Sequence, residues 1–192
     1  MEDFDIPPEC MQVIDRVLFT PEQIQRRVSE LGAQITEDYA GKSLLLIGVL
    51  RGVIFFMVDL LREIHIPVEV DFMSVNSYSP ESRDLGFVRL VKDLELSITD
   101  RHILFVEDII DTGLTLNYLL RTLKARQPAS LEVCVLFNKE KRRLIDLSLQ
   151  YEGFKIPDYY VVGYGLDYQE KYRNMPFVGL LKAEVLQNNQ GF

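Results

Sequence analysis

The sequence predicts an α/β protein with a doubly wound, mostly parallel sheet flanked by helices. Residues 43–49 (SLLLIGV) form a continuous apolar run of strand length, as expected of a parallel strand that is covered on both faces. Strand-like runs alternate along the chain with helical patterns, and this order favours parallel sheets. The chain has 192 residues, 47% of them hydrophobic, and shows no repeat or linker. We therefore expect one domain, residues 1–192, with a sizeable core.

The first half of the chain predicts two helices and two strands. Residues 20–23 (TPEQ) carry a capping-box pattern with proline at the first helical position. Apolar residues follow at spacings of three and four, which predicts an amphipathic helix ended by Gly41. After the strand at 43–49, a second helix is expected over residues 51–65. Residues 68–75 (VEVDFMSV) begin with strict alternation, which predicts a half-exposed edge strand.

The second half predicts further strands around one more helix. A polar stretch rich in helix and strand breakers, residues 76–86, is expected to be a long loop. Strands are expected at residues 87–91 and 103–106, and leucines within residues 116–123 mark a helix. The buried run LEVCVLF and residues 159–162 predict two more strands. The remaining tail shows no long helical pattern and is expected to form a small accessory lobe.

Composition excludes several classes of function. The formal net charge is −8 and the sequence pI is about 4.9, which argues against nucleic acid as a partner. Cys10 and Cys134 lack the spacing of a disulfide framework or a zinc site. The first eleven residues are acidic and broken by prolines, unlike a targeting peptide, and no apolar run is long enough to span a bilayer. We therefore expect a cytoplasmic protein without a membrane partner.

Residues 102–116 (HILFVEDIIDTGLTL) place three acids, Glu107, Asp108 and Asp111, where a buried strand leads into a helix. Ligands of doubly wound sheets bind outside the carboxyl ends of the strands. The loop DTGLT offers a glycine, two hydroxyls and free amides at a helix N-terminus, which suits a phosphate group. The spacing differs from that of a Walker A loop. From spacing alone, helix caps and a solvated strand end explain the same residues equally well.

Residues 106–115 (VEDIIDTGLT) resemble the phosphoribosyl-pyrophosphate (PRPP) binding signature of the type I phosphoribosyltransferases. Other segments resemble the hypoxanthine-guanine branch of that family in the expected order. These segments are GVLRG (48–52), Ser77-Tyr78, Lys139 and PDYYVVGYGLDYQEKYRNMP (157–176). The resemblance covers residues 44–182. It implies the type I phosphoribosyltransferase fold with a small hood lobe made by the terminal segments, 1–19 and 158–192, the latter binding the base.

The resemblance implies an enzyme of purine salvage. Such enzymes transfer ribose 5-phosphate from PRPP to N9 of hypoxanthine or guanine and release IMP or GMP and pyrophosphate. The transition state resembles an oxocarbenium ion, as in glycoside cleavage. The family requires Mg²⁺ to neutralise the leaving pyrophosphate, and its members are dimers or tetramers, so a homo-oligomer is expected.

The three acids then receive separate roles. Glu107 and Asp108 match the pair that holds the ribose hydroxyls and Mg²⁺, since carboxylates accept hydroxyl hydrogen bonds and favour a hard cation. Asp167 matches a second acid associated with the metal. Asp111 matches the general base and acid at purine N7. With Asp111, the 5′-phosphate cradle comprises Thr112, Gly113, Leu114 and Thr115, of which Leu114 contributes only backbone.

The pyrophosphate would be held by two further segments. Arg51 and Gly52 match the strand-end turn whose amides approach pyrophosphate, and the peptide bond before this position is often cis in the family. Arg173 matches a second contact, where a planar guanidinium suits phosphate oxygens. By itself, Arg51 reads more simply as an exposed residue of the first helical turn.

The purine would be held by the segments that follow. Lys139 matches the lysine that donates to the 6-oxo group, which disfavours a 6-amino purine. It begins a run of charges, residues 139–143, and such runs are usually solvated. Tyr160 matches the ring that stacks on the purine, and Val161 would contribute backbone groups. A tyrosine near a strand is more often a core residue, so this assignment depends on the family register.

Residues 77–86 match the mobile lid of the family, in which Ser77 and Tyr78 would reach the site and closure would exclude water. Two alternative functions differ from this one in what they require of the sequence. One is a non-catalytic regulator that shares the fold and either binds RNA or senses nucleotides. The RNA-binding form would need a basic face, and this chain is acidic. Transferases for other bases lack the arrangement of Lys139 and VVGYGLDY.

Overall fold

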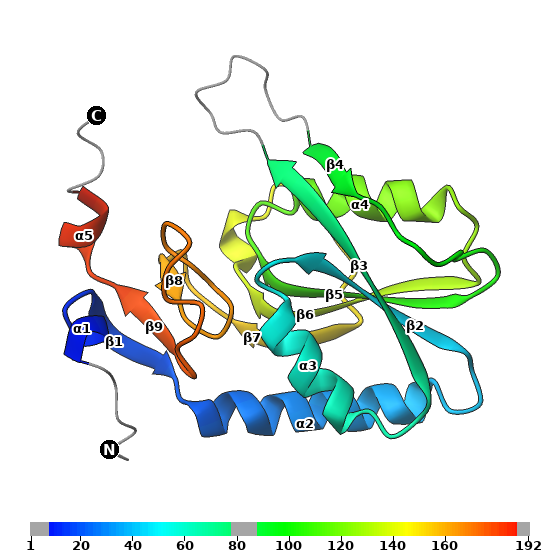
Figure 1. Cartoon of the computed structure of the whole chain (residues 1–192), viewed down its shortest axis with the longest axis horizontal. Helices are drawn as coiled ribbons and strands as arrows, with labels where there is room; N and C mark the ends of the chain where they lie inside the picture. The colour runs from blue at the N-terminus through cyan, green and yellow to red at the C-terminus, as the bar shows by residue number, and fades with distance from the viewer. Residues whose placement is uncertain (1–7, 78–87, 188–192) are drawn as a thin grey trace.

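The computed structural model describes residues 8–77 and 88–187, and within them it forms two sheets (Figure 1). The larger sheet has the strand order β4 (Val88–Lys92), β3 (Val68–Ser77), β2 (Leu44–Leu50), β5 (His102–Ile110), β6 (Ser130–Asn138) and β7 (Tyr151–Lys155). All its neighbours pair in parallel except β3 and β4. The smaller, antiparallel sheet has the order β1 (Ile14–Phe19), β9 (Val178–Leu181) and β8 (Val161–Val162).

Helices cover both faces of the larger sheet, as expected of a doubly wound fold. On one face, α2 (Pro21–Asp38) and α3 (Ile54–Glu63) pack against side chains such as Leu44 and Leu46 of β2. On the other face, α4 (Leu114–Lys124) packs against the cluster that contains Leu45 and Ile47. Successive residues of β2 therefore enter opposite core layers, which explains why its sequence is apolar throughout.

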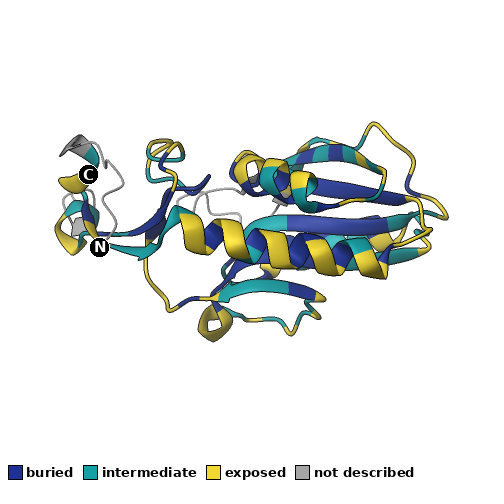
Figure 2. Cartoon of the chain, turned by 90° about the horizontal axis from the view of Figure 1, so that it is seen from below, coloured by how far each residue is buried: buried dark blue, intermediate teal, exposed yellow. Residues whose placement is uncertain are grey.

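The predicted capping box begins α2. The hydroxyl of Thr20 accepts a hydrogen bond from the Gln23 backbone N–H at 3.3 Å, and the Gln23 side chain accepts one from the Thr20 N–H at 2.9 Å. The helix ends at Asp38, and Gly41 follows with a φ of 75°. The predicted apolar stripe is buried against the sheet while the opposite face of α2 is exposed (Figure 2).

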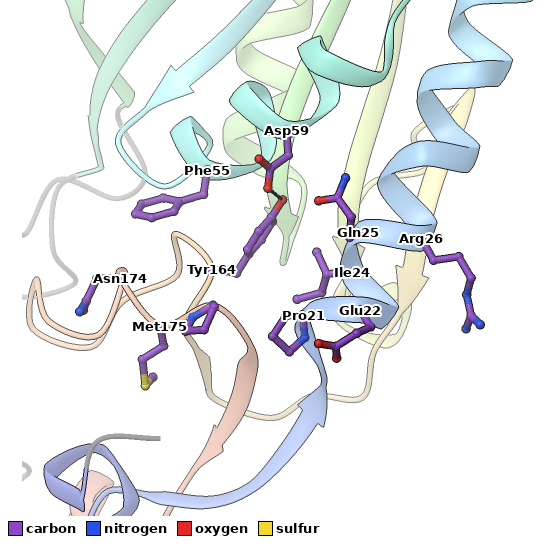
Figure 3. A pocket seen from close by; sticks show the side chains of 11 residues that line it. Pro21, Glu22, Ile24, Gln25, Arg26, Phe55, Asp59, Tyr164, Asn174 and Met175 are labelled. Carbon is purple, nitrogen blue, oxygen red and sulfur yellow. Dashed lines mark hydrogen bonds between the residues drawn. The ribbon is translucent and has the colours of Figure 1, made fainter. Parts of the chain in front are cut away.

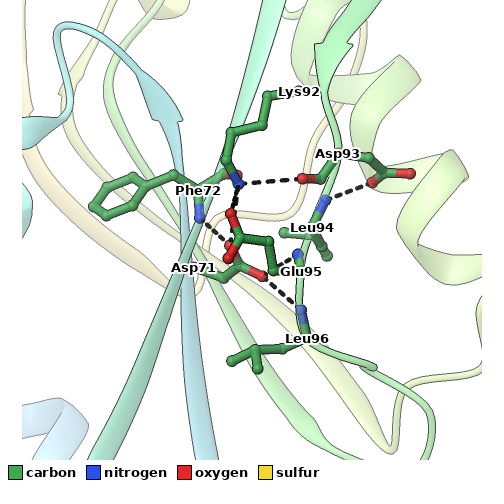
Figure 4. Close-up of polar contacts among 7 residues, drawn as sticks. All are labelled: Asp71, Phe72, Lys92, Asp93, Leu94, Glu95 and Leu96. Atoms are coloured by element: carbon green, nitrogen blue, oxygen red, sulfur yellow. Dashed lines mark hydrogen bonds and ion pairs between the residues drawn. The ribbon is translucent and has the colours of Figure 1, made fainter.

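The prediction of an edge strand at residues 68–75 was wrong for the second half of β3. Strand β4 pairs with β3 from Ser74 to Ser77, so that only the first half of β3 forms an edge of the sheet. The buried Asp71 ties the chain after β4 to this edge (Figure 4). Its carboxylate accepts hydrogen bonds from the backbone N–H groups of Phe72, Glu95 and Leu96 at 2.7–2.9 Å.

Strand β5 is longer than predicted. It continues through the two acids to Ile110, and the ladder pairs Glu107 with Val135 and Ile110 with Asn138 of β6. The acids were expected after the end of the strand, but they lie inside it. Their backbone is consequently fixed by a central strand pair rather than by a loop.

The hood lobe is built from both ends of the chain, as expected. It contains the smaller sheet together with the short helices α1 (Pro8–Met11) and α5 (Ala183–Gln187), at the left of Figure 1. A separate cluster of buried residues, including Ile14 and Phe177, forms its core. Strands β1, β7 and β9 had not been predicted. None of the helices within the described residues is both long and apolar enough to cross a bilayer.

Candidate active site

Two neighbouring cavities lie where β5 and β6 end. We name the first the Lys139 cavity, which has a volume of about 250 Å³. Three segments that are distant in sequence line it: the end of β5, the residue after β6, and the hood segment around β8. Of the predicted site residues it contains Asp108, Asp111, Lys139, Tyr160, Val161, Asp167 and Arg173.

The second cavity, which we name the Gly113 cavity, has a volume of about 180 Å³. The predicted residues that line it are Glu107, Asp111, Thr112, Gly113 and Thr115. It lies at the N-terminus of α4, where the first-turn amides and the helix dipole favour an anion. Leu114 is absent from its lining, and its side chain is 51% exposed. Asp111 lines both cavities and therefore stands between them.

Position 113 requires glycine for two reasons, the backbone conformation and the lack of space for a side chain. Its φ is 80°, in the left-handed region that favours glycine. A Cβ at this position would also lie 2.9 Å from Cδ1 of Leu147. The loop is thus packed from outside by the segment that follows β6.

Glu107 and Asp108 are adjacent acids that point to different cavities, as alternating residues of a strand do. Burial raises the pKa of Asp108 to about 6, although a hydrogen bond from the Ile109 N–H and the charge of Arg173 act in the opposite direction. Burial and the neighbouring charge of Asp108 raise the pKa of Glu107 well above its ordinary value. Oε2 of Glu107 is buried and has no hydrogen-bond partner within the described residues.

This pair fits a hard cation and hydroxyl donors. A buried carboxylate oxygen without a partner is costly, and a hydroxyl or a cation would satisfy it. The described part of the chain contains no cluster of three or more His, Cys, Asp or Glu that could hold a metal by itself. A metal bound here would take its other ligands from substrate and water, which is the usual manner in which Mg²⁺ binds at phosphate sites.

Asp167, the third predicted metal-associated acid, is already paired. Its Oδ1 lies 2.8 Å from Nη2 of Arg173, and its Oδ2 accepts a hydrogen bond from the Glu170 N–H at 2.9 Å. Glu170 in turn pairs with Arg173 at 3.1 Å and with Arg51 at 3.2 Å. The two predicted pyrophosphate arginines are thus joined through one glutamate that the sequence analysis had not identified.

Arg51 and Gly52 adjoin the site without lining either cavity. The Arg51 side chain is 68% exposed, and the Leu50–Arg51 peptide bond is cis, as the resemblance implied. Gly52 lies directly against Asp108, so that a Cβ at this position would overlap the Asp108 carboxylate. The residue has to be glycine for the strand end to approach the acid this closely.

Lys139 is buried, and its backbone N–H donates to the carbonyl of Ile110 at 3.0 Å, which fixes it beside the end of β5. Its ammonium lies 4.0 Å from Oδ1 of Asp158, its one ion-pair partner in the described chain. Tyr160 is 43% exposed, and its ring contacts that of Tyr168 edge to face at 5.4 Å. Burial, and then the charge of Asp167, raise the pKa of Tyr160.

The predicted lid residues are scarcely covered by the structure. Ser77 is the last residue of β3, while Tyr78 and residues 79–86 lie outside the described residues.

Sequence reasoning missed Arg142 and Asp158. Arg142 belongs to the charge run that was expected to be solvated, but it forms an ion pair with Asp111 at 3.0 Å and another with Asp158 at 3.3 Å. The available signal was the position of the run immediately after Lys139, at the carboxyl end of a core strand. Which of its cations folds back onto the site could not be read from their order.

A larger cavity, of about 670 Å³, lies between α2, α3 and the hood segment (Figure 3). Its lining includes Phe55 and the pair in which the Tyr164 hydroxyl donates to Asp59 at 2.7 Å. None of the predicted site residues lines it. Chemical character rather than volume therefore identifies the candidate active site.

Comparisons with known proteins show the family. Residues 18–169 match the family described as the phosphoribosyl transferase domain. The chain belongs to the phosphoribosyltransferase family. A hypoxanthine-guanine phosphoribosyltransferase of Streptococcus mutans is 46% identical over 174 residues, covering 91% of this chain and 97% of the relative. One from Bacillus subtilis is 45% identical over 175 residues, covering 91% and 97%.

A solved structure supports the same branch of the family. The crystal structure of a hypoxanthine phosphoribosyltransferase from Staphylococcus aureus superposes with a TM-score of 0.90 at 44% identity, covering 94% of this chain and 98% of that one. The hypoxanthine-guanine phosphoribosyltransferases are thus the branch in which this chain lies.

Proposed function

We propose that this enzyme transfers the ribose 5-phosphate group of PRPP to N9 of hypoxanthine or guanine, yielding IMP or GMP and pyrophosphate. The observation that carries the proposal is the position of Asp111 between two cavities of different character. The Gly113 cavity, at a helix N-terminus, suits the 5′-phosphate, and the Lys139 cavity suits the purine. The two ends of the nucleotide product would then lie on either side of this carboxylate.

The residues of the Lys139 cavity provide the purine chemistry. The Lys139 ammonium would donate to the 6-oxo oxygen and stabilise charge that develops there as N9 attacks. Asp111 would accept the proton that the ring loses at N7 and return it in the reverse reaction. Tyr160, which lines the cavity and is half-exposed, would stack on the ring.

The ribose and pyrophosphate would be held by charge. As the bond from C1′ to the pyrophosphate oxygen breaks, the electron pair leaves with pyrophosphate and the sugar gains oxocarbenium character. Glu107 and Asp108 would accept hydrogen bonds from the ribose hydroxyls, and Arg51 and Arg173 would face the leaving group. Bound at the acid pair, Mg²⁺ would neutralise charge on the pyrophosphate.

An assay with purified protein tests the proposal. With PRPP and Mg²⁺, hypoxanthine or guanine should be converted to IMP or GMP, and adenine should yield far less product. Xanthine, tested in parallel, measures how far the 6-oxo group suffices for recognition. A protein that binds PRPP and IMP but forms no product from either base would instead be a regulator that shares the fold.

The proposal includes four further expectations. The enzyme requires Mg²⁺, so activity should disappear with EDTA and return with added Mg²⁺. It forms a dimer or tetramer, which analytical ultracentrifugation would detect. It resides in the cytoplasm, and it binds no nucleic acid, which a filter-binding assay at low salt would check.

A further inference from the structure

We propose that Arg142 and Asp158 are positioning residues that fix Asp111 and Lys139 relative to each other, so that the two groups fit one edge of a 6-oxopurine. This inference rests on the function proposed above, which assigns those two side chains to N7 and to the 6-oxo group. N7 and O6 are adjacent on the same edge of a 6-oxopurine: O6 is an acceptor, and N7 of the attacking base carries the proton that Asp111 would accept. The groups that read them must therefore hold a fixed spacing.

Two nitrogens of Arg142 contact the carboxylate of Asp111. Its Nε lies 3.0 Å from Oδ1 of the aspartate, and its Nη1 donates to Oδ2 at 3.1 Å. Only the contact to Oδ2 is a hydrogen bond, and Oδ1 accepts none within the described residues, so that Nε faces it as an ion-pair partner. A planar guanidinium with two nitrogens facing the two carboxylate oxygens restrains the orientation of the carboxylate as well as its charge. A lysine at this position would supply the charge from a single nitrogen.

Asp158 extends the contact to Lys139. Its Oδ1 lies 3.3 Å from Nη1 of Arg142 and 4.0 Å from Nζ of Lys139. The four side chains therefore alternate in charge, from Asp111 through Arg142 and Asp158 to Lys139. Each member faces an opposite charge, so displacement of the central pair would leave both outer groups less constrained.

The backbone supports this arrangement. The short 3₁₀ helix Glu140–Arg142 follows Lys139 directly, and the Arg142 N–H donates to the Lys139 carbonyl at 2.9 Å. Two residues further on, the Leu144 N–H donates to the carbonyl of Thr112 at 3.0 Å. The segment that carries Arg142 is thus attached at one end to the lysine and at the other to the phosphate loop.

Arg142 and Asp158 would act without contacting the ligand themselves. Neither residue lines the Lys139 cavity or the Gly113 cavity, whereas both of the groups they hold do. Their side chains are 44% and 54% exposed, so neither is required to fill the core. Substitutions here should alter the placement of Asp111 and Lys139 while leaving the fold intact.

The test compares Arg142→Met, Asp158→Asn and the double variant with the wild-type enzyme, using full steady-state kinetics for hypoxanthine and PRPP. Each single variant should lose about 10- to 100-fold in kcat/KM for hypoxanthine, the size of effect expected when a catalytic group is slightly misplaced. The KM for PRPP should stay within about twofold, because the phosphate contacts are untouched. Discrimination against adenine should fall in the same variants.

Two further variants separate positioning from a general effect of charge. Lys141→Gln removes one cation from the same turn, at an exposed residue for which the described chain shows no ion pair, and should match the wild type. Arg142→Lys should recover only part of the lost activity, since a single ammonium cannot face both carboxylate oxygens of Asp111. The double variant should be no worse than the poorer single variant, because each single change already breaks the same connection.

Single variants within twofold of the wild type would overturn the proposal, as would losses that multiply in the double variant or an equal rise in the KM for PRPP. Urea unfolding midpoints close to the wild type confirm that a kinetic loss does not come from unfolding. If Arg142→Met unfolds, the kinetics of Asp158→Asn test the proposal by the same criterion. An inactive wild-type enzyme would remove the proposed function itself, which is a different result from active enzyme with unaffected variants.

Discussion

Replacing Asp108 by asparagine should stabilise the unliganded protein while impairing catalysis. Burial lifts the pKa of this carboxyl from 3.8 to about 6 in the fold, so its ionisation opposes folding. A difference of about 2 pKa units, at 1.36 kcal/mol per unit, corresponds to about 3 kcal/mol at neutral pH. That figure is net of the attraction between Asp108 and Arg173, because this attraction lowers the pKa and is already contained in the value of about 6.

The sign of the pH dependence follows from the raised pKa. Well below pH 3.8 the carboxyl is protonated in both the folded and the unfolded chain, and its contribution is nil. As the pH rises from about 4 to about 6, the unfolded chain ionises first and the folded state loses stability. The full penalty is present above about pH 6. The gain from Asp108→Asn should therefore shrink from as much as 3 kcal/mol near pH 7.5 to about 1 kcal/mol near pH 4.5.

Thermal and urea unfolding without ligands or metal would measure this effect. For a chain of this length, 1 kcal/mol corresponds to about 2–4 °C in Tm. Asp146→Asn, which removes the same charge from an exposed position, is the matched control and should change stability by less than about 0.5 kcal/mol. A destabilised Asp108→Asn protein at pH 7.5, or a gain of equal size at pH 4.5, would refute the reasoning. The activity of the Asp108→Asn variant should fall, because it lacks the carboxylate that is proposed to hold the ribose hydroxyls and the metal.

Three other changes give sharp expectations. Asp111→Asn should lower kcat by about 100-fold or more while IMP affinity changes little, measured by steady-state kinetics and calorimetry; joint loss of both with unfolding would support a helix-capping role instead. Gly52→Ala should reduce kcat/KM strongly, because the new Cβ would displace the Asp108 carboxylate, and unchanged kinetics would argue against that contact. Asp71→Ala should cost about 2–4 kcal/mol in urea unfolding by leaving three backbone N–H groups without their acceptor, with kcat of the folded fraction unchanged.

The main sheet could be predicted because its signal is local. Apolar runs such as that of β2 report burial on both faces, and the Thr20 capping box marks a helix start within four residues. The hood strands carry no such signal. Strand β1 pairs with β9 from the far end of the chain, and its sequence IDRVLF has little alternation. Long-range pairing of short, irregular strands is decided by the partner rather than by the strand itself.

The site residues also divide into those with a local sequence signal and those without one. The acids, the phosphate loop and Lys139 could be located because each occupies a fixed place in a recognisable motif. Arg142 could not, because a run of five charges does not show which guanidinium folds back onto Asp111. The role of Glu170 as the link between Arg51 and Arg173 was hidden for a similar reason. Both residues act through partners that the topology brings together.

The pairing of β1 with β9 also has a consequence for synthesis on the ribosome. The six strands of the larger sheet and the phosphate loop are complete by Lys155, but β1 must wait for Val178–Leu181 to emerge. Strand β8, which follows Tyr160, depends on that same late segment for its pairing. A nascent chain that stops before β9 would therefore contain the segments that form the Gly113 cavity, but strand β8 beside Tyr160 would have no partner strand. The proposed recognition of the purine would therefore require β9 to have been synthesised.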